Sequence, residues 1–482
     1  MNKRIFVTSG VIMVFILILS VWVLPVAGQG GGAMSTAFAV QNLGSDAAEV
    51  WVEFRDANGN LTNVISRTIA PGSNYNFDQR YSSGYPGRDS FQGSVIVRAN
   101  QPIGAIANMM RTGGIVPAYE SYNALDTSGV GKDIMLPQIL KNVNSAGLVW
   151  NTTIVIQNTD IYNSANVRLV FNPDPIINPA IGGTLTHPYT HSLTIPAGGT
   201  VYIDQATTPS AVQIGERFFG SVRVLSDRDV APVVYSDGGG RILLAYPSYA
   251  AGTTDYIVLP SIYKNIMSLG DSYSTAILIV NFGDITATVE IEYLPISNEY
   301  TVSGKDTVYV PPHSSKNVDQ RTDAPSITSP TFMGGAVLKS TNGQPIAAMV
   351  NLRGGSRYGM TYGGIMRGGT TAYIPIAYKA ISSAGYSWSS TIIVYNFDRA
   401  LGDANVNFTF YPAAGGSIVD QNNYTVSSIR QFDLRFTTVI ANQTSFIGAI
   451  KVTSTRPIGL MVQTRGAGGV GDALMAFLGL MP

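Results

Sequence analysis

Few side chains in this sequence have the chemistry for catalysis or metal binding, because it contains three histidines and no cysteine. The absence of cysteine excludes disulfides, thiolate nucleophiles and thiolate metal sites. His187 and His191 are four residues apart, a spacing that suits a metal half-site only on a helix. Pro188 opposes a helix there, so we interpret both histidines as loop residues near a hairpin tip. His313 follows Pro311-Pro312, where the sequence implies no partner for it, and is predicted to be a solvated turn residue.

An aspartate recurs at one place in four segments of the chain, followed by glutamine in three of them. These residues are Asp78-Gln79, Asp204-Gln205, Asp319-Gln320 and, in a divergent copy, Asp433. A carboxylate could bind calcium or form half of the acid pair of a glycosidase. An enzyme needs one asymmetric site, however, whereas a residue repeated four times is typical of a structural turn. The sequence therefore predicts no catalytic, cofactor-binding or metal-ligating residue, and no cofactor.

Three large aromatic residues could form a platform on which sugars stack. In three of the four segments one of them stands at the start of an expected strand; they are Trp150, Tyr273 and Trp388. That recurrence favours anchors at the edge of a hydrophobic core over a ligand platform. Glycine-rich segments such as 353–355 and 363–369 lack the strand–loop–helix context and the lysine of a phosphate-binding loop. We interpret them as hairpin loops.

The composition favours an all-β protein that does not bind nucleic acid. Of the 482 residues, 45% are hydrophobic and only 12% are charged, with 51 Gly, 25 Pro and 25 Tyr, which suits strands joined by many turns. The 30 Lys and Arg balance the 30 Asp and Glu. Without a basic block, the chain has nothing to attract a phosphate backbone.

The elements that position these residues come from an internal repeat. In each copy an asparagine follows a large residue by eight, with apolar residues at alternate positions between them, which predicts a strand. The four pairs are Met34/Asn42, Trp150/Asn158, Tyr273/Asn281 and Trp388/Asn396. A turn, an Ala-x-Val return strand, a Phe-x-Gly strand and a last strand follow. Repeats of about 115 residues with six or seven short strands predict antiparallel β-sandwich domains that fold separately, like beads on a string.

The boundaries between repeats depend on a strand that ends in Leu-Pro. It precedes repeats two and three as Leu136-Pro137 and Leu259-Pro260, repeat four has the proline as Pro375, and the chain itself ends Leu480-Met481-Pro482. If this strand closes the preceding unit, all four units are complete, with boundaries near 138, 261 and 376. If it opens the following unit, repeat one lacks a strand and the last residues are an orphan. Completeness favours the first interpretation. A structure in which residues 134–136 pair with strands of residues 139–261 would overturn it. The predicted domains are 29–138, 139–261, 262–376 and 377–482.

The first 28 residues are typical of a secretory signal peptide. A basic start is followed by an apolar stretch that ends at Pro25, and Val26-Ala27-Gly28 offers a cleavage site before Gln29. The alternative is an uncleaved membrane anchor, because the apolar run is near the roughly 20 residues that span a bilayer. Either way we expect the rest of the chain to lie outside the cytoplasmic membrane.

The motif Leu136-Pro137…Lys141-Asn142 followed by Trp150–Asn158 resembles a tandem repeat of exported, mostly uncharacterised bacterial cell-surface proteins. The resemblance covers residues 30–482 and departs from the pattern at Met34 and at Leu434. It implies immunoglobulin-like β-sandwich units in an extracellular or envelope protein. Such families bring no catalytic residues that could be carried over to this chain.

The sequence thus predicts an all-β fold of four tandem antiparallel, Ig-like β-sandwiches preceded by a signal peptide helix. The expected function is that of a secreted or cell-surface, non-enzymatic structural or adhesive protein. One alternative is an extracellular module that binds polysaccharide or cell wall through exposed aromatic residues, and another is a glycoside hydrolase with a site between domains. The partner would be an extracellular protein or polysaccharide. Contact with a membrane would occur only through an uncleaved signal segment.

Overall fold

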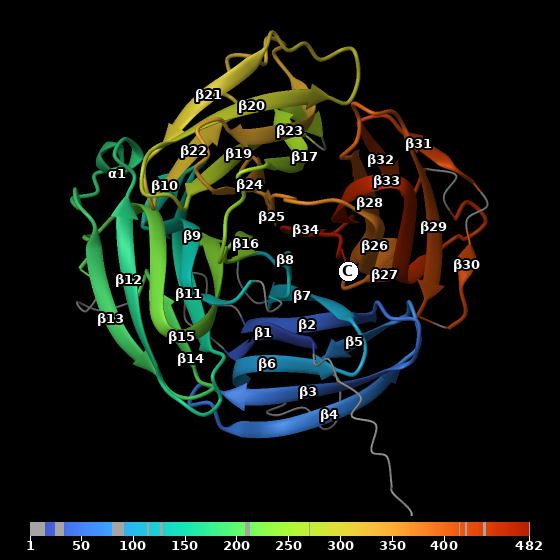
Figure 1. Ribbon diagram of the computed structural model, residues 1–482, viewed down its shortest axis with the longest axis horizontal. Helices are drawn as coiled ribbons and strands as arrows, with labels where there is room; N and C mark the ends of the chain where they lie inside the picture. The colour runs from blue at the N-terminus through green and yellow to red at the C-terminus, as the bar shows by residue number, and fades with distance from the viewer. Residues whose placement is uncertain are drawn as a thin grey trace, which may run out of the picture.

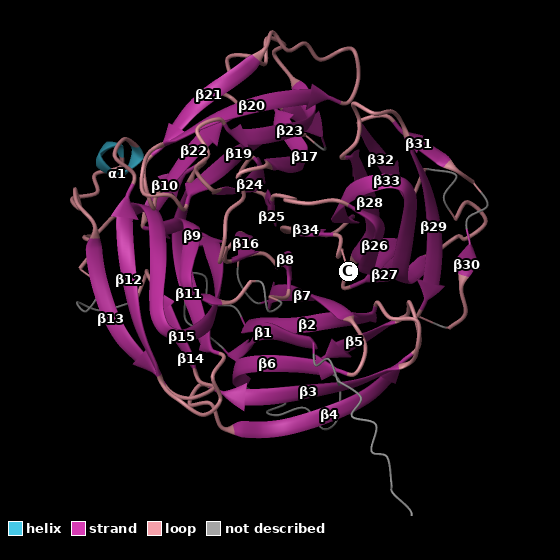
Figure 2. Ribbon diagram, viewed as in Figure 1, coloured by secondary structure: helices cyan, strands magenta, loops and turns pink. Residues whose placement is uncertain are grey.

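The fold is known from a computed structural model, whose described residues form strands and connecting loops apart from one four-residue helix, α1 (Ile177–Ala180). It describes residues 15–24, 33–79, 91–112, 115–125, 129–207, 213–268, 270–413, 415–419, 422–436 and 440–481. Figures 1 and 2 show four groups of antiparallel strands that follow one another around a ring. We number these groups, in chain order, units one to four. The prediction of an all-β chain built from repeats is confirmed.

Each unit contains eight or nine of the described strands. Unit one holds β1 (Phe15–Leu24), β2 (Ala33–Asn42), β3 (Ala48–Asp56), β4 (Leu61–Ile69), β5 (Asn74–Asp78), β6 (Phe91–Ala99), β7 (Ile103–Thr112) and β8 (Ala118–Asn123). Unit two holds β9 (Gly131–Lys141), β10 (Val143–Ser145), β11 (Leu148–Asn158), β12 (Ala165–Pro173), β13 (Tyr189–Ile195), β14 (Thr200–Asp204), β15 (Phe218–Gly238) and β16 (Ile242–Pro247).

The second half of the chain repeats this order. Unit three holds β17 (Tyr256–Lys264), β18 (Ile266–Ser268), β19 (Asp271–Asn281), β20 (Ala287–Pro295), β21 (Lys305–Val310), β22 (Ser315–Asp319), β23 (Phe332–Ser340), β24 (Ile346–Gly354) and β25 (Tyr358–Gly363). Unit four holds β26 (Gly369–Lys379), β27 (Ile381–Ser383), β28 (Tyr386–Asn396), β29 (Ala404–Pro412), β30 (Ile418–Val419), β31 (Tyr424–Val426), β32 (Ile429–Asp433), β33 (Phe446–Ala467) and β34 (Leu474–Leu478).

Unit three shows the layers of a unit most clearly. One sheet has the order β17-β23-β20-β21, and the other has the order β18-β19-β24-β25 with β22 on β19. In units two and four, one long strand (β15 or β33) bends through both sheets. The predicted alternation along β20 is confirmed: Val289, Ile291 and Tyr293 are buried, whereas Glu290 and Glu292 are partly exposed. The buried side chains of both sheets form the core of the unit.

The asparagine of the repeat ties the first strand of each unit to the loops around it. In unit three the buried Asn281 side chain donates to the backbone oxygens of Ile285, Val310 and Pro311, and its Oδ1 accepts from the N–H of Gly283 at 2.8 Å. Asn42, Asn158 and Asn396 make the corresponding contacts. A buried amide with all these partners satisfies turn carbonyls that would otherwise lack donors, which explains its fixed position in the repeat.

The Leu-Pro strand opens the following unit, so the favoured boundaries are wrong. Ile134–Leu136 lies in β9, which pairs with β15 so that Leu136 faces Val222. β17 pairs with β23 and β26 with β33 in the same way. Pro137 falls where the β9–β15 register shifts, a position that tolerates a residue without an N–H. Local sequence identifies such a strand but does not determine which neighbouring sheet supplies its partner.

The N-terminal segment differs from expectation, whereas Leu480 lies in unit four, the domain to which the sequence assigns it. Phe15–Leu24 is strand β1 in the structure rather than a signal helix, and it pairs with β6 in the place that β9 takes beside β15. The predicted cleavage site at Gly28/Gln29 lies outside the described residues. Near the C-terminus, the backbone N–H and C=O of Leu480 both bond to Tyr373 of β26, so these residues complete unit four. None of the described helices has the length and apolar character needed to cross a membrane.

The units do not hang like beads on a string, because β8, β16, β25 and β34 meet at the centre of the ring (Figure 1). β8 and β25 each contact the other three strands, and β16 and β34 each contact both β8 and β25. The apolar clusters also cross the junctions: that of unit one includes Val155 and Val233 of unit two, and that of unit three includes Met461 of unit four. A repeat that buries residues of its neighbour gains stability from the ring, an effect that composition alone does not reveal.

Candidate functional site

The candidate site lies at the seams, the junctions between successive units. In each unit, two paired strands carry side chains at alternate positions that face a neighbouring unit rather than the core of their own unit. These pairs of strands are β2 and β7, β11 and β15, β19 and β24, and β28 and β33. The pairs Ser35/Met110, Asn151/Asp237, Ser274/Arg353 and Ser389/Arg465 lie opposite each other in these strands, so Met110, Asp237, Arg353 and Arg465 are equivalent. Equivalent positions in the four units therefore hold different residues with different surroundings.

Seam 2/3 is closed by direct contacts. Unit three contributes Arg353, whose guanidinium lies 4.1 Å from the centre of the Trp150 ring and donates to Ser145 Oγ at 3.1 Å. Beside it, Asn351 Nδ2 donates to Gln138 Oε1 at 2.7 Å. Burial lowers the pKa of Arg353 to about 10. A cavity of about 480 Å³ flanks these residues and is also lined by Asn317 and Arg321, and Asn351 Oδ1 is buried without a hydrogen-bond partner.

Seam 3/4 has the same plan with fewer contacts. Arg465 and Gln463 of unit four face Tyr273 and Tyr358 of unit three across a cavity of about 270 Å³. The Arg465 guanidinium lies 6.0 Å from the Tyr358 ring centre, further than Arg353 lies from Trp150. Burial raises the pKa of Tyr273, and Arg465 beside its hydroxyl opposes that rise. Arg465 Nη2 and Gln431 Nε2 are buried donors without a hydrogen-bond partner.

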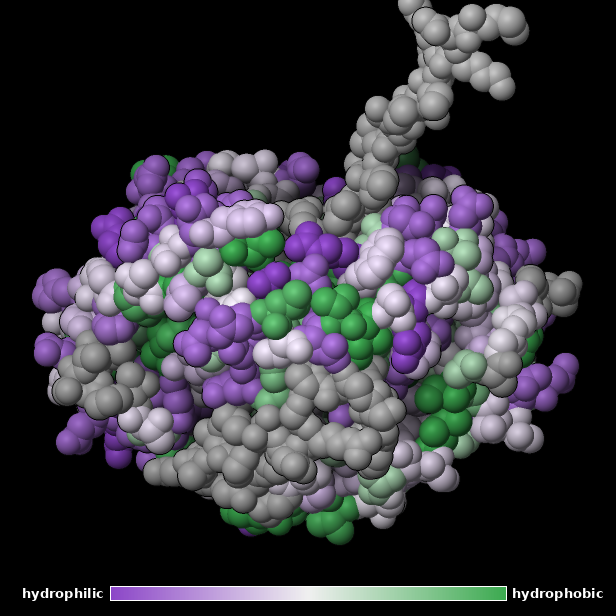
Figure 3. All heavy atoms as spheres, turned by 90° about the horizontal axis from the view of Figure 1, so that it is seen from below, coloured by the Kyte–Doolittle hydropathy of each residue, from purple (hydrophilic) through white to green (hydrophobic). Residues whose placement is uncertain are grey.

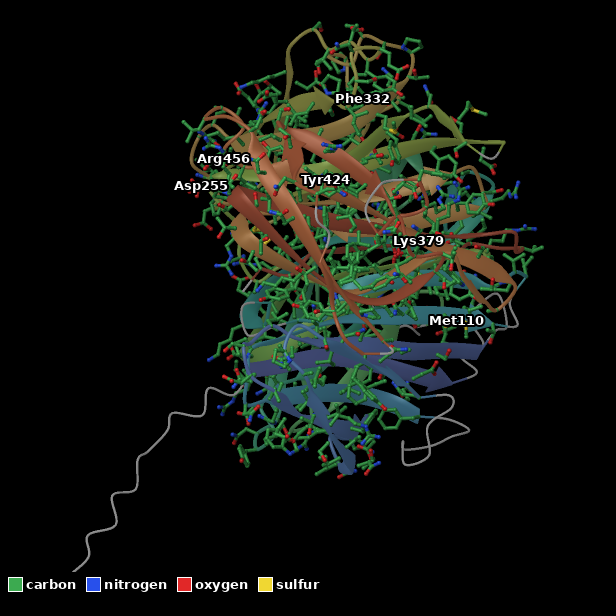
Figure 4. All side chains as sticks on the ribbon, turned by 90° about the vertical axis from the view of Figure 1, so that its right-hand side faces the viewer. Met110, Asp255, Phe332, Lys379, Tyr424 and Arg456 are labelled. Carbon is green, nitrogen blue, oxygen red and sulfur yellow. The ribbon has the colours of Figure 1, made fainter. Side chains whose placement is uncertain are left out.

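Seams 4/1 and 1/2 take two further forms. At seam 4/1 a cavity of about 410 Å³ is lined by Met110, Tyr119 and Trp388, and the rings of Tyr119 and Trp388 are 5.0 Å apart. Figure 4 shows Met110 of unit one below Lys379 of unit four at this junction. At seam 1/2, Arg111 is buried and forms an ion pair with Asp237. The four seams thus range from apolar to charged.

Two carboxyl groups lie at the axis where the units meet. Glu120 of β8 accepts from the N–H of Ser121 at 2.8 Å and of Thr361 in unit three at 2.9 Å. Asp472 accepts from the N–H of Gly359 at 3.1 Å and of Leu243 at 3.4 Å. Burial raises the pKa of both groups; the charge of Asp472 raises the pKa of Glu120 further, whereas Arg111 opposes the rise in the pKa of Asp472. Because both are fully buried and bonded to backbone N–H groups of other units, they connect the ring.

The structure places the sequence candidates mostly in supporting roles. Trp150, Tyr273 and Trp388 are buried core-edge anchors, as predicted. Of the recurring aspartates, Asp204, Asp319 and Asp433 each accept from the N–H two residues on, at 2.9–3.0 Å, which is a turn contact. Among the described residues no group of three or more His, Asp or Glu could hold a metal ion.

The histidines are separate, and one prediction about them is wrong. His187 contacts Thr186, but His191 lies within β13 opposite Leu169, so its interpretation as a loop residue is wrong. His313 has a positive φ of 47° in a turn, as expected, but its Nε2 lies 2.8 Å from Asp284 Oδ1, so it has a partner. The pairing escapes sequence reasoning because the two residues come from different turns of unit three.

Sequence reasoning missed Arg111, Glu120, Asp472 and Arg465. A signal was present in the repeat itself. Trp150, Tyr273 and Trp388 lie opposite Gly238, Gly354 and Gly466, whereas Met34 lies opposite Arg111. A charge that replaces a glycine of the repeat marks a position with a different partner.

Comparison with known proteins does not identify a family. No protein-family model matches the chain, and no curated protein matches its sequence. Among solved structures, the chain is similar to a tetra-tandem repeat in the extending region of a large adhesion protein, with 11% identity over 96% of this chain and 97% of the other. The TM-score is 0.10, which is too low to carry an argument about fold or function.

Proposed function

We propose that this chain is an exported, non-enzymatic structural or adhesive protein whose immunoglobulin-like units form one rigid ring. The observation that carries the proposal is the junction of β8, β16, β25 and β34 at the axis, with Glu120 and Asp472 bonded across units. A ring of this kind holds the turns of four units at fixed distances, which suits attachment to a partner at several points.

Large apolar residues on equivalent turns support the adhesive role. Tyr162, Ile285 and Leu401 follow the buried asparagine of their units by four or five residues and are 85%, 59% and 72% exposed. Single exposed apolar residues are ordinary, but the same turn exposes one in three of four units. Figure 3 shows hydrophobic residues scattered among hydrophilic ones on one side of the molecule, so contact would be multivalent rather than through one large patch.

Beads coated with the purified protein test this role. We expect the beads to attach to cells or to a hydrophobic surface, and we expect the triple variant Tyr162→Ser/Ile285→Ser/Leu401→Ser to attach weakly while melting at an unchanged temperature. The matched control changes three exposed polar residues, Asn163→Ser/Thr286→Ser/Asp403→Ser. Equal attachment by the triple variant would contradict the adhesive role.

The proposed export rests on residues 1–28, and it has a structural consequence. Cleavage after Gly28 would remove β1 and leave β6 without the strand that pairs with nine of its residues. Retention of the segment would leave unit one like the others. Cell fractionation with N-terminal sequencing separates these cases. Protein confined to the cytoplasm with an intact N-terminus would overturn the proposed export.

A second candidate function is binding of a polysaccharide. The observation in its favour is seam 3/4, where tyrosine rings, amides and guanidinium groups line a cavity. Such groups suit a saccharide, whose hydroxyls need donors and acceptors while its apolar faces pack on aromatic rings.

A further inference from the structure

We propose that seam 3/4 binds one carboxylate-bearing sugar unit, such as a hexuronate of an extracellular polysaccharide. The proposal deepens the adhesive function above and rests on it, because it names a ligand that an attachment protein would hold. The residues that carry it are Arg465, Gln431 and Gln463 of unit four and Tyr273 and Tyr358 of unit three.

The charge of the cavity favours an acid. Two guanidinium groups line it, those of Arg435 and Arg465, and its described lining residues include no Asp or Glu. Arg435 is paired with Asp433 at 2.6 Å. Arg465 contributes a positive charge that lies 6.0 Å from the Tyr358 ring centre and beside the Tyr273 hydroxyl. A planar guanidinium binds a carboxylate through two parallel hydrogen bonds, so Arg465 is the expected carboxylate partner.

Unpaired donors in the cavity walls point the same way. Arg465 Nη2 and Gln431 Nε2 are buried without a partner, although buried donors in folded proteins are nearly always bonded. Gln463 Oε1 accepts only a long bond from Tyr263 Oη at 3.5 Å, and its Nε2 donates to the weak acceptor Met360 Sδ at 3.3 Å. A ligand rich in oxygen atoms would supply the acceptors that these side chains lack.

The remaining walls favour a sugar over a small inorganic anion. The rings of Tyr273 and Tyr358 are 6.0 Å apart with an interplanar angle of 22°, and both line the cavity. Hydroxyls of Ser268, Ser389 and Thr391 line it as well. The volume of about 270 Å³ is close to the lower end of ordinary ligand sites, roughly 300 Å³, which fits one sugar unit rather than a longer segment.

The test is a calorimetric titration of the purified full chain with sodium D-glucuronate, glucose and sodium acetate. We expect saturable binding of glucuronate, at least about tenfold tighter than binding of either glucose or acetate, because the site needs both the charge and the ring. Glucose binding as tightly as glucuronate would overturn the role of Arg465. Acetate binding as tightly would reduce the site to an anion site and overturn the sugar proposal, as would the absence of saturable binding.

Variants locate the binding. Arg465→Gln removes the charge from a partly exposed side chain and should weaken glucuronate binding at least about tenfold, whereas Arg465→Lys should weaken it less. Gln431→Glu places a negative charge in the cavity and should weaken binding at least as much as Arg465→Gln. The matched control is Arg321→Gln, which removes an exposed arginine from seam 2/3 and should leave binding within about twofold.

Unchanged binding by Arg465→Gln would place the sugar elsewhere and overturn the proposal. Failure of this sugar-binding proposal is distinguishable from failure of the proposed adhesive function. If the protein is exported and attaches through its apolar turns but does not bind glucuronate, only the proposal of a sugar site at seam 3/4 is overturned. If the protein stays in the cytoplasm but binds glucuronate at seam 3/4, the proposed adhesive function is overturned instead.

Discussion

Seams 2/3 and 3/4 have the same kinds of residue on equivalent strands, but the contacts of their arginines differ. In seam 2/3 the Trp150 ring lies under Arg353, and Gln138 reaches Asn351. In seam 3/4 the residues at the corresponding positions are the smaller Tyr273 and Ser261, and Gln463 contacts Tyr263 and Met360 instead. The guanidinium is therefore structural in the first seam and available in the second. The difference comes from the unit that faces the arginine rather than from the unit that carries it.

Unit one extends this comparison. A side chain at Gly238 would place its Cβ 2.7 Å from the Trp150 ring, and one at Gly354 would be 2.5 Å from the Tyr273 ring. Glycine is therefore required opposite the aromatic residue. With Met34 in place of the aromatic, the opposite position can hold Arg111, which pairs with Asp237 across seam 1/2. One exchange within the repeat thus changes a packing contact into an ion pair.

The largest expected effect comes from Trp150→Ala. Trp150 is fully buried, and its loss removes packing, the stacked Arg353 and the indole N–H donated to Ser145 O. We expect the free energy of unfolding to fall by about 3–5 kcal/mol in denaturant titrations. Tyr273→Ala, at seam 3/4, should cost clearly less, because no arginine there lies as close to an aromatic ring as Arg353 lies to Trp150. Equal losses would show that the two seams are equally closed.

Much of each unit can be predicted from the sequence, because the information is local. Alternating apolar residues and the eight-residue spacing to Asn281 determine strands and turns within a few residues of each other. The partner of β9 could not be predicted in this way, since the same Leu-Pro strand could pair with either neighbouring unit. Phe15–Leu24 is equally ambiguous, because an apolar run of that length suits both a signal segment and a strand. The ring depends on contacts between distant repeats.

The candidate site was harder to predict than the fold. Arg353 and Arg465 look alike in sequence, and each precedes a glycine. Their roles differ because of Trp150 and Tyr273 in the preceding unit, and only the ring brings these residues together. Chemistry at a seam is invisible to reasoning that treats each repeat as a separate domain.

The second prediction compares the two arginines directly. Arg353→Met removes the hydrogen bond to Ser145 Oγ and the stacking on Trp150, and leaves Asn351 beside an apolar chain. We expect a loss of about 1–2 kcal/mol in the free energy of unfolding. Arg465→Met should change it by less than about 0.5 kcal/mol, because this arginine has an unpaired donor and few contacts. The comparison fails if Arg465→Met is the more damaging of the two.

The third prediction separates the seams from the axis. Burial raises the pKa of Glu120 above 4.5 and that of Asp472 above 3.8, so the folded state holds protons that the unfolded state has released. The stability from these protons is complete below the unfolded pKa values and is lost as the pH rises through the folded ones. We therefore expect the melting temperature to fall as the pH rises from about 4.5.

The control for this pH dependence is the double variant Glu120→Gln/Asp472→Asn, in which the fall should be much smaller. The charged groups near the pair are the two carboxyls themselves and Arg111. Trp150→Ala and Tyr273→Ala should retain the wild-type slope, because neither residue lies at the axis. A slope that changes with either seam variant would mean that seams and axis are coupled.

The smallest effect on stability is expected from converting one seam into the other. Ser261→Gln/Tyr273→Trp gives seam 3/4 the partners that close seam 2/3, and Gly354 already leaves room opposite the ring. We expect a change of less than about 1 kcal/mol in unfolding free energy, since the new contacts of Arg465 and Gln463 offset the strain of larger side chains. Binding of glucuronate should nevertheless fall at least about tenfold, because Arg465 would stack on the indole as Arg353 does. Retained binding with a closed seam would show that the facing unit does not decide the role of the arginine.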